Sequence, residues 1–153
     1  MDIGAQTLTL VESGKTAAVY TISTALNGPG ERQNSGCTPR GEHYVRACIG
    51  AGQPINSVFV GRRPTGELYS AQLAQEHPER DWILTRILWL CGREWGSNRG
   101  PGVDSFRRFI YIHGTPDSEP MGVPRSHGCV RMRNRDLVEL FERVPPGTPV
   151  LIR

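Results

Sequence analysis

The chain has 153 residues, of which 18 are basic and 15 acidic, so its formal net charge at pH 7 is only +3. Acidic and basic residues are interspersed and form no long basic block, which argues against nucleic-acid binding. The length is usual for one domain, and an apolar content of 37% is enough for one buried core. We therefore expect residues 1–153 to form a single domain.

The first half of the chain favours strands joined by loops. Residues 7–11 and 16–22 are Thr- and Val-rich runs on either side of the turn-like tetrad ESGK, and together they predict a β-hairpin. Residues 27–41 are dense in Gly, Pro, Asn and Ser, which is typical of a loop. Residues 42–49 and 57–62 then have the composition of two more strands.

Two helices are predicted in the second half. Residues 70–77 contain helix formers behind Ser70, a suitable N-cap, and Pro78 ends the run. Residues 134–144 give the clearest helical pattern, because Asn134 can cap the helix and the apolar side chains fall on one face.

The remaining strands include one segment whose structure the sequence leaves open. Residues 81–92, DWILTRILWLCG, have an apolar spacing that suits a helix, whereas their β-branched and aromatic content followed by a glycine suits a buried strand. Residues 107–113 alternate as a strand that ends at His113, and residues 148–152 form a last strand. These elements add up to a mostly β domain with one or two short helices.

The cysteines are spaced irregularly and form no C-x-x-C pair, which argues against a zinc ribbon and a thioredoxin-like motif. They are Cys37, Cys48, Cys91 and Cys129. A zinc site made of His113, His127 and Cys129 is an alternative, but H-x-C lacks the spacing of ordinary structural sites and no fourth ligand is evident. We predict no metal and no cofactor.

The strongest chemical pattern is residues 111–132, YIHGTPDSEPMGVPRSHGCVRM. A thiol attacks only as the thiolate, so a nucleophilic Cys129 needs an imidazole or positive charges nearby to lower its pKa. His113 and His127 are candidate bases, and several arginines surround them. Gly128 lets a substrate carbonyl approach the backbone, where amide N–H groups stabilise an oxyanion. The pattern therefore indicates acyl transfer, with a packed core thiol as the alternative.

The run SHGCVRM, preceded by IHG, resembles the signature of the L,D-transpeptidase catalytic-domain family. Residues 38–41, TPRG, are similar to the T-P-x-G element of that family, and the closing helix and strand with GTPV agree with it. The resemblance extends from about residue 7 to 152. It implies the β-sandwich-like fold of the family, mostly β, with one or two short helices packed on it.

The resemblance also implies a role for each residue of the site. Cys129 matches the nucleophile, and His113 matches the base that accepts the thiol proton. Gly114 stands where a backbone carbonyl accepts a hydrogen bond from the other ring nitrogen of that histidine. The amides around His127, Gly128 and Cys129 match the oxyanion hole.

Three further residues are expected to contact the substrate, namely Arg131, Ser126 and Tyr111. For Arg131, the planar guanidinium suits a substrate carboxylate. For Tyr111 the alternative is simple packing on the sheet, and the sequence favours that alternative. The third contribution to the catalytic group is not a side-chain carboxylate, so Asp117 is given no role although it is close in sequence.

The implied reaction acts on the stem tetrapeptides of bacterial peptidoglycan. The Cys129 thiolate attacks the carbonyl before the terminal D-amino acid, which leaves, and an acyl-enzyme remains. Water would then complete an L,D-carboxypeptidase reaction, whereas an amine of a neighbouring stem would complete a transpeptidase reaction. The expected partners are stem peptides or muropeptides. A catalytically silent peptidoglycan-binding module is the competing hypothesis.

The N-terminal sequence bears on the choice between these reactions. Residues 1–15 lack a positively charged start, a long apolar run and a small-residue cleavage site, and no segment of the chain is long enough to be an integral membrane segment. If Met1 is the natural start, we expect a cytoplasmic hydrolase in peptidoglycan recycling. If Met1 replaces a removed signal, a periplasmic cross-linking enzyme is the alternative. The sequence does not predict the oligomeric state.

Overall fold

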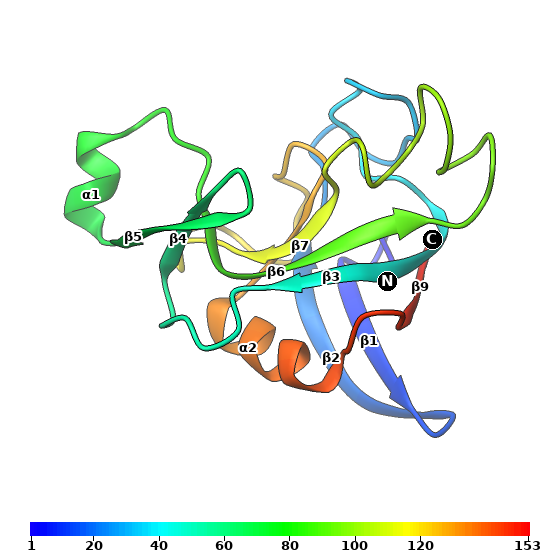
Figure 1. The fold of residues 1–153 in the computed structure, drawn as a ribbon, viewed down its shortest axis with the longest axis horizontal. Coiled ribbons are helices and arrows are strands. Elements are labelled where there is room, and N and C mark those ends of the chain that lie inside the picture. Colours follow the sequence, from blue (N-terminus) through cyan, green and yellow to red (C-terminus); the bar gives the residue numbers. More distant parts are fainter.

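Nine strands join in one hydrogen-bonded sheet that curls on itself, and two short helices complete the computed structural model, which describes residues 1–153 (Figure 1). The strands are β1 Thr7–Glu12, β2 Lys15–Ser23, β3 Gly41–Ile49, β4 Ser57–Val60, β5 Arg63–Leu68, β6 Ile83–Gly92, β7 Tyr111–Gly114, β8 Val130–Met132 and β9 Pro149–Ile152. The helices are α1 Ala71–Glu76 and α2 Asn134–Arg143. The expected mostly β fold is confirmed.

The strand order is β1-β2-β8-β7-β6-β3-β9, and β4 joins β6 and carries β5. All pairs are antiparallel except β7 and β8, which are parallel and place His113 opposite Arg131. The two ends of this order approach each other, because Arg153 donates to the carbonyl of Met1 at 3.0 Å and Ile3 donates to that of Arg153 at 2.7 Å. The sheet is therefore strongly curled.

The core lies inside the curl and holds the central strands in place. Ile112 of β7 and Val130 of β8 point into it, and α2 adds Leu137 and Leu140 from one face. Burying one such side chain stabilises the fold by roughly 1.5–3 kcal/mol. Since side chains alternate along a strand, the neighbours of Ile112 and Val130 point to the opposite face of the sheet. Cys129 and Tyr111 belong to a second, smaller apolar cluster there.

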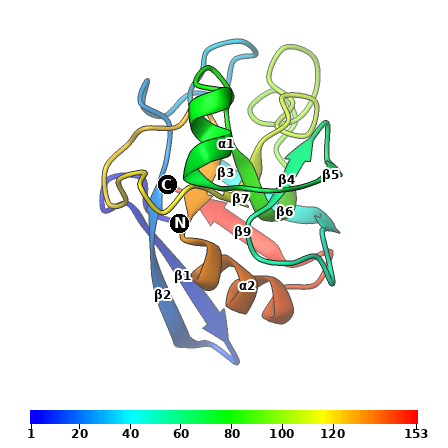
Figure 2. The same cartoon turned by 90° about the vertical axis from the view of Figure 1, so that its left-hand side faces the viewer.

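The two helices lie on opposite sides of the sheet (Figures 1 and 2). Helix α2 packs against β6 and β7, whereas α1 extends from the β4–β5 hairpin and buries none of its residues. Ser70 caps α1 by accepting from the Leu73 N–H at 3.1 Å, as predicted. Neither helix has the length and apolar character needed to cross a lipid bilayer.

Several predicted boundaries are corrected by the structure. In the segment 81–92, whose structure the sequence left open, residues Ile83–Gly92 form strand β6. Strand β7 starts only at Tyr111, because Phe109 has a left-handed φ of +58° that interrupts extended structure. The N-cap of α2 is Arg133, since Asn134 is already helical. Strands β5 and β8 were not predicted, the first being polar and the second only three residues long.

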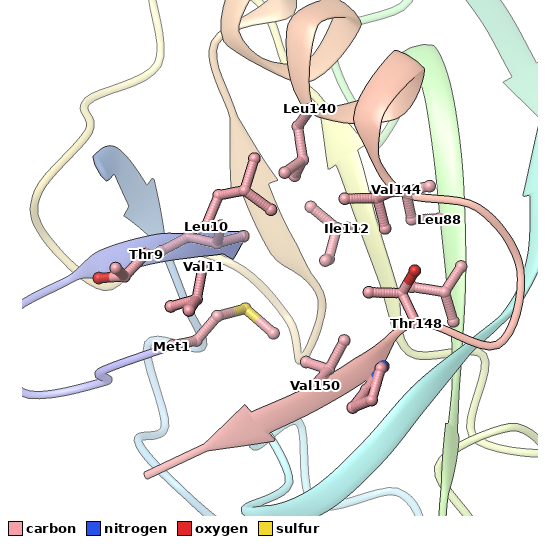
Figure 3. Close-up of a pocket in the computed structure, with 13 residues that line it drawn as sticks. Met1, Thr9, Leu10, Val11, Leu88, Ile112, Leu140, Val144, Thr148 and Val150 are labelled. Atoms are coloured by element: carbon pink, nitrogen blue, oxygen red, sulfur yellow. The ribbon is translucent and has the colours of Figure 1, made fainter. Parts of the chain in front are cut away.

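An apolar cavity of about 170 Å³ lies between β1, β9 and α2 (Figure 3). Met1, Leu10, Ile112 and Val144 are among the side chains that line it. The lining is mostly apolar and contains no histidine, cysteine or carboxylate side chain. Histidine and cysteine side chains instead line a cavity on the other face of the sheet.

Candidate active site

Cys129 and His113 line one cavity of about 310 Å³, on the face of the sheet opposite the core. Strands β7 and β8, the loop before β8 and the turn of the β4–β5 hairpin form its walls. The predicted residues Tyr111, Ser126 and Arg131 line the same cavity. The structure therefore brings together the residues that the SHGC pattern and the IHG strand end singled out.

The sulfur of Cys129 is held against the beginning of β7. Its Sγ–H donates to the carbonyl oxygen of Phe109 at 3.3 Å, and the N–H of Tyr111 donates to Sγ at 3.4 Å. The left-handed backbone at Phe109 turns this carbonyl out of the strand pattern. Cys129 also lies immediately before β8, so β8 fixes its backbone while the start of β7 fixes its sulfur.

His113 is buried in β7, with Nδ1 2.8 Å from the carbonyl oxygen of Gly114. A carbonyl only accepts, so Nδ1 carries the hydrogen and Nε2 keeps its lone pair. In this tautomer the imidazole can accept a proton at Nε2. Gly114 thus makes the contact that the resemblance to the family implied for it.

The loop before Cys129 is fixed by hydrogen bonds on both sides. The Gly128 N–H donates to Ser126 Oγ at 3.2 Å, and the Ser126 hydroxyl donates to the Cys129 carbonyl. Gly128 has a φ of +134°, which favours glycine. Three amides were expected in the oxyanion hole, and that of Gly128 is already engaged by its hydrogen bond to Ser126. The N–H groups of His127 and Cys129 make no hydrogen bond within the chain.

The three expected substrate contacts are all engaged within the protein. Arg131 donates to Asp81 at 3.0 Å and to Glu119 at 3.4 Å, so its guanidinium is not a free carboxylate site. Ser126 is buried, and its hydroxyl holds the loop instead of facing a ligand. Tyr111 packs edge-on against a tryptophan ring and accepts from Arg62 at 3.0 Å. Their direct contact with substrate remains a prediction.

Two charged residues of the cavity were missed in the sequence. Asp81 lies 3.0 Å from Arg131 and 3.6 Å from Nδ1 of His127, whose side chain is 78% exposed. Arg62 lies in the hairpin turn, 4.8 Å above the rings of both Trp89 and Phe109. Both come from segments far from the SHGC run, and no local pattern links them to it.

The electrostatics of the cavity favour a neutral thiol at Cys129 and a neutral imidazole at His113. Desolvation raises the pKa of Cys129 to about 12, and the negative charge of Asp81 acts in the same direction. The Tyr111 N–H and the positive charges of Arg131 and Arg108 oppose this rise but do not overcome it. Desolvation also lowers the pKa of His113. The sequence predicted that nearby cations lower the thiol pKa, and burial outweighs them.

No group of three or more His, Cys, Asp or Glu side chains is arranged to hold a metal ion. His113, His127 and Cys129 share the cavity without forming such a group. The zinc site that the sequence left open as an alternative therefore has no support in the geometry.

Comparison with known proteins gives a consistent result. Residues 1–152 match the family model described as YkuD, L,D-transpeptidase catalytic domain. YqjB of Bacillus subtilis is 43% identical over 61 residues, which are 40% of this chain and 34% of YqjB. YbiS of Escherichia coli is 54% identical over 43 residues, which are 28% of this chain and 14% of YbiS. Both are named as L,D-transpeptidases, and the matches span about a third of their length or less.

Solved structures share the fold. The catalytic domain of the E. faecium L,D-transpeptidase acylated by ertapenem has a TM-score of 0.56 and 20% identity, covering 100% of this chain and 93% of that one. The L,D-transpeptidase from Mycobacterium smegmatis has a TM-score of 0.55 and 20% identity, covering 99% of this chain and 56% of that one. At such identities the likeness concerns the fold alone.

Proposed function

This chain belongs to the YkuD L,D-transpeptidase catalytic-domain family, and from that premise we propose that it cleaves L,D peptide bonds of peptidoglycan stems by acyl transfer to Cys129. One observation carries the proposal. Cys129 lines the same cavity as His113, whose hydrogen bond to the Gly114 carbonyl leaves Nε2 ready to accept a proton.

The proposed first step joins proton transfer to nucleophilic attack. Because the free thiol and the free imidazole are both stable as neutral groups, His113 takes the thiol proton as Sγ bonds to the carbonyl carbon. The N–H groups of Cys129 and His127 face the oxyanion that forms. The C–N bond then breaks, the imidazolium returns its proton to the leaving amine, and a thioester remains on Cys129.

The second step depends on the acceptor. With water, the thioester is hydrolysed and the protein is an L,D-carboxypeptidase, the reaction that suits peptidoglycan recycling in the cytoplasm. With an amine of a second stem, a cross-link forms, which suits the periplasm. We propose the hydrolytic reaction, with cross-linking as the alternative, and fractionation of cells that produce the untagged protein tests the location.

Incubation with a purified stem tetrapeptide, followed by mass spectrometry, tests the activity. A tripeptide product supports hydrolysis, and a dimer supports transpeptidation. An unchanged tetrapeptide contradicts both. A silent binding module would instead retain the peptide without cutting it.

Two variants test the assigned roles. Cys129→Ser and His113→Gln are each expected to lower kcat/KM by about a thousandfold or more, because both act in the same bond-forming step. The matched control is Cys48→Ser, since Cys48 lies in β3 and donates to the Val144 carbonyl at 3.4 Å, away from the cavity. Equal activity of Cys129→Ser and Cys48→Ser would exclude the cysteine mechanism.

A further inference from the structure

A buried hydroxyl joins the loop before β3 to the loop that carries Cys129. Thr38 is 0% exposed, and its Oγ1 lies 3.0 Å from the N–H of Ala25 and 2.9 Å from the carbonyl oxygen of Gly128. An N–H only donates and a carbonyl only accepts, so the direction of both hydrogen bonds is fixed. The Thr38 hydroxyl therefore donates its hydrogen to the Gly128 carbonyl.

That carbonyl belongs to the same peptide unit as the N–H of Cys129. The chain contains no cis peptide bond, and in a planar trans unit the C=O and N–H point in opposite directions. By fixing the Gly128 carbonyl, Thr38 also directs the Cys129 N–H away from the loop that carries Thr38. This N–H makes no hydrogen bond within the chain, and Cys129 itself lines the cavity.

The loop that presents Thr38 is itself held in place. The Thr38 N–H donates to the Gly28 carbonyl at 3.1 Å, and the Thr38 carbonyl accepts from the Gly30 N–H at 2.9 Å. Arg108 donates to the carbonyls of Gly30 at 3.1 Å and Cys37 at 2.6 Å. The hydroxyl is thus held by a preorganised loop, as a support for an oxyanion donor must be.

We propose that Thr38 is a positioning residue for acyl transfer, whose hydroxyl holds the Cys129 N–H in the direction that stabilises the oxyanion. This inference rests on the proposed function, because it assigns the N–H to the carbonyl that Cys129 attacks. Thr38 touches neither the sulfur nor the substrate in this scheme. Its effect passes through one rigid peptide unit.

Two reactions of the same sulfur separate this role from a merely structural one. Attack on p-nitrophenyl acetate forms an oxyanion, whereas alkylation by iodoacetamide displaces iodide at a saturated carbon and forms none. Both are measured as the difference between each protein and its Cys129→Ser counterpart. For Thr38→Val we expect acylation to fall by about tenfold or more, while alkylation stays within about twofold of the wild-type rate.

Two further variants and a control complete the test. Thr38→Ser keeps the donor and is expected to restore acylation. Thr38→Cys offers a weaker donor and is expected to give an intermediate rate, and it replaces the valine variant should that one fail to fold. Thr148→Val removes another threonine-to-carbonyl hydrogen bond, from Thr148 Oγ1 to the Pro145 carbonyl at 2.7 Å, and is expected to change neither rate because Thr148 does not line the cavity of Cys129.

The outcomes distinguish this inference from the proposed function. If Thr38→Val slows both reactions equally, or neither, the positioning role is wrong even if stem peptides are cut. If the wild-type protein cuts no stem peptide but acylation and alkylation separate as expected, the proposed function fails and the positioning role stands.

Discussion

The α-carbon of Gly114 lies against the side chain of Asn134, and a Cβ at position 114 would overlap the amide oxygen of that asparagine. The same Cβ would lie 2.6 Å from the carbonyl oxygen of Leu84. Asn134 cannot yield easily, because it accepts from Thr85 at 2.6 Å and donates to the Thr115 carbonyl at 2.8 Å. Position 114, directly after His113, therefore has no room for a side chain.

We predict that Gly114→Ala destabilises the fold and disturbs the site together. Relief of the overlap must move buried groups, which costs about 2 kcal/mol or more in the free energy of unfolding. The carbonyl that orients His113 moves as well, so kcat should fall. Urea unfolding and peptide cleavage measure the two effects. Gly4→Ala is the control, since its nearest contact is at 3.4 Å, and equal stability of both variants would contradict the prediction.

The residues around Gly114 differ in how far their roles could be predicted from the sequence. His113 and Cys129 were singled out because they lie in one contiguous pattern whose chemistry constrains residue type, and the role of Gly114 was implied by the resemblance to the family. Asn134 was assigned a helix cap, which is the usual role of asparagine at such a position. In the structure its side chain instead ties β6 to the loop after β7. Tertiary hydrogen bonds, which no local pattern shows, decide its role.

Residues brought in by the fold were beyond the reach of sequence patterns. Asp81 reaches the cavity because β6 pairs with β7 and places the preceding loop beside Arg131. Arg62 reaches it because Gly61 and Arg62 form a tight turn, with φ values of +54° and +67°, where the sequence had favoured a continuing strand. The predicted lowering of the Cys129 pKa was also wrong, because a sequence shows the charged residues but not the desolvation of the thiol.

The reactivity of Cys129 in the free protein is predicted to rise with pH without levelling off below pH 9. Its pKa of about 12 keeps the thiolate fraction small, so the alkylation rate should increase nearly tenfold per pH unit from pH 7. An ordinary exposed thiol would level off near its pKa of about 8.5. Iodoacetamide kinetics at several pH values measure this. A plateau below pH 8 would mean that a thiolate–imidazolium pair already exists without substrate.

The carboxylate of Asp81 is predicted to restrain that thiol. Its negative charge raises the pKa of Cys129, so Asp81→Asn should speed alkylation by about threefold or more at pH 8. Glu119→Gln is the matched control, because Glu119 also pairs with Arg131, at 3.4 Å, and is not among the charges that act on the thiol. Equal rates for the two variants would show that the charge of Asp81 is not responsible.

Two buried histidines are predicted to limit stability in acid. Burial lowers the pKa of both His113 and His43, and His43 lies 2.8 Å from Ser105 Oγ in the interior. Below pH 6.5 the unfolded chain therefore binds protons that the folded chain does not, and the free energy of unfolding falls as the pH falls. Each histidine contributes up to about 1.4 kcal/mol per pH unit until its folded-state pKa is reached.

Urea unfolding between pH 7 and about 5 measures this slope, a range in which the unfolded histidines gain their protons. His43→Gln and His113→Gln should each remove one part of the slope, although each also lowers stability at pH 7 by losing buried hydrogen bonds. If His43→Gln and His113→Gln both keep the slope of the wild-type protein, the buried histidines are not the cause of the acid sensitivity.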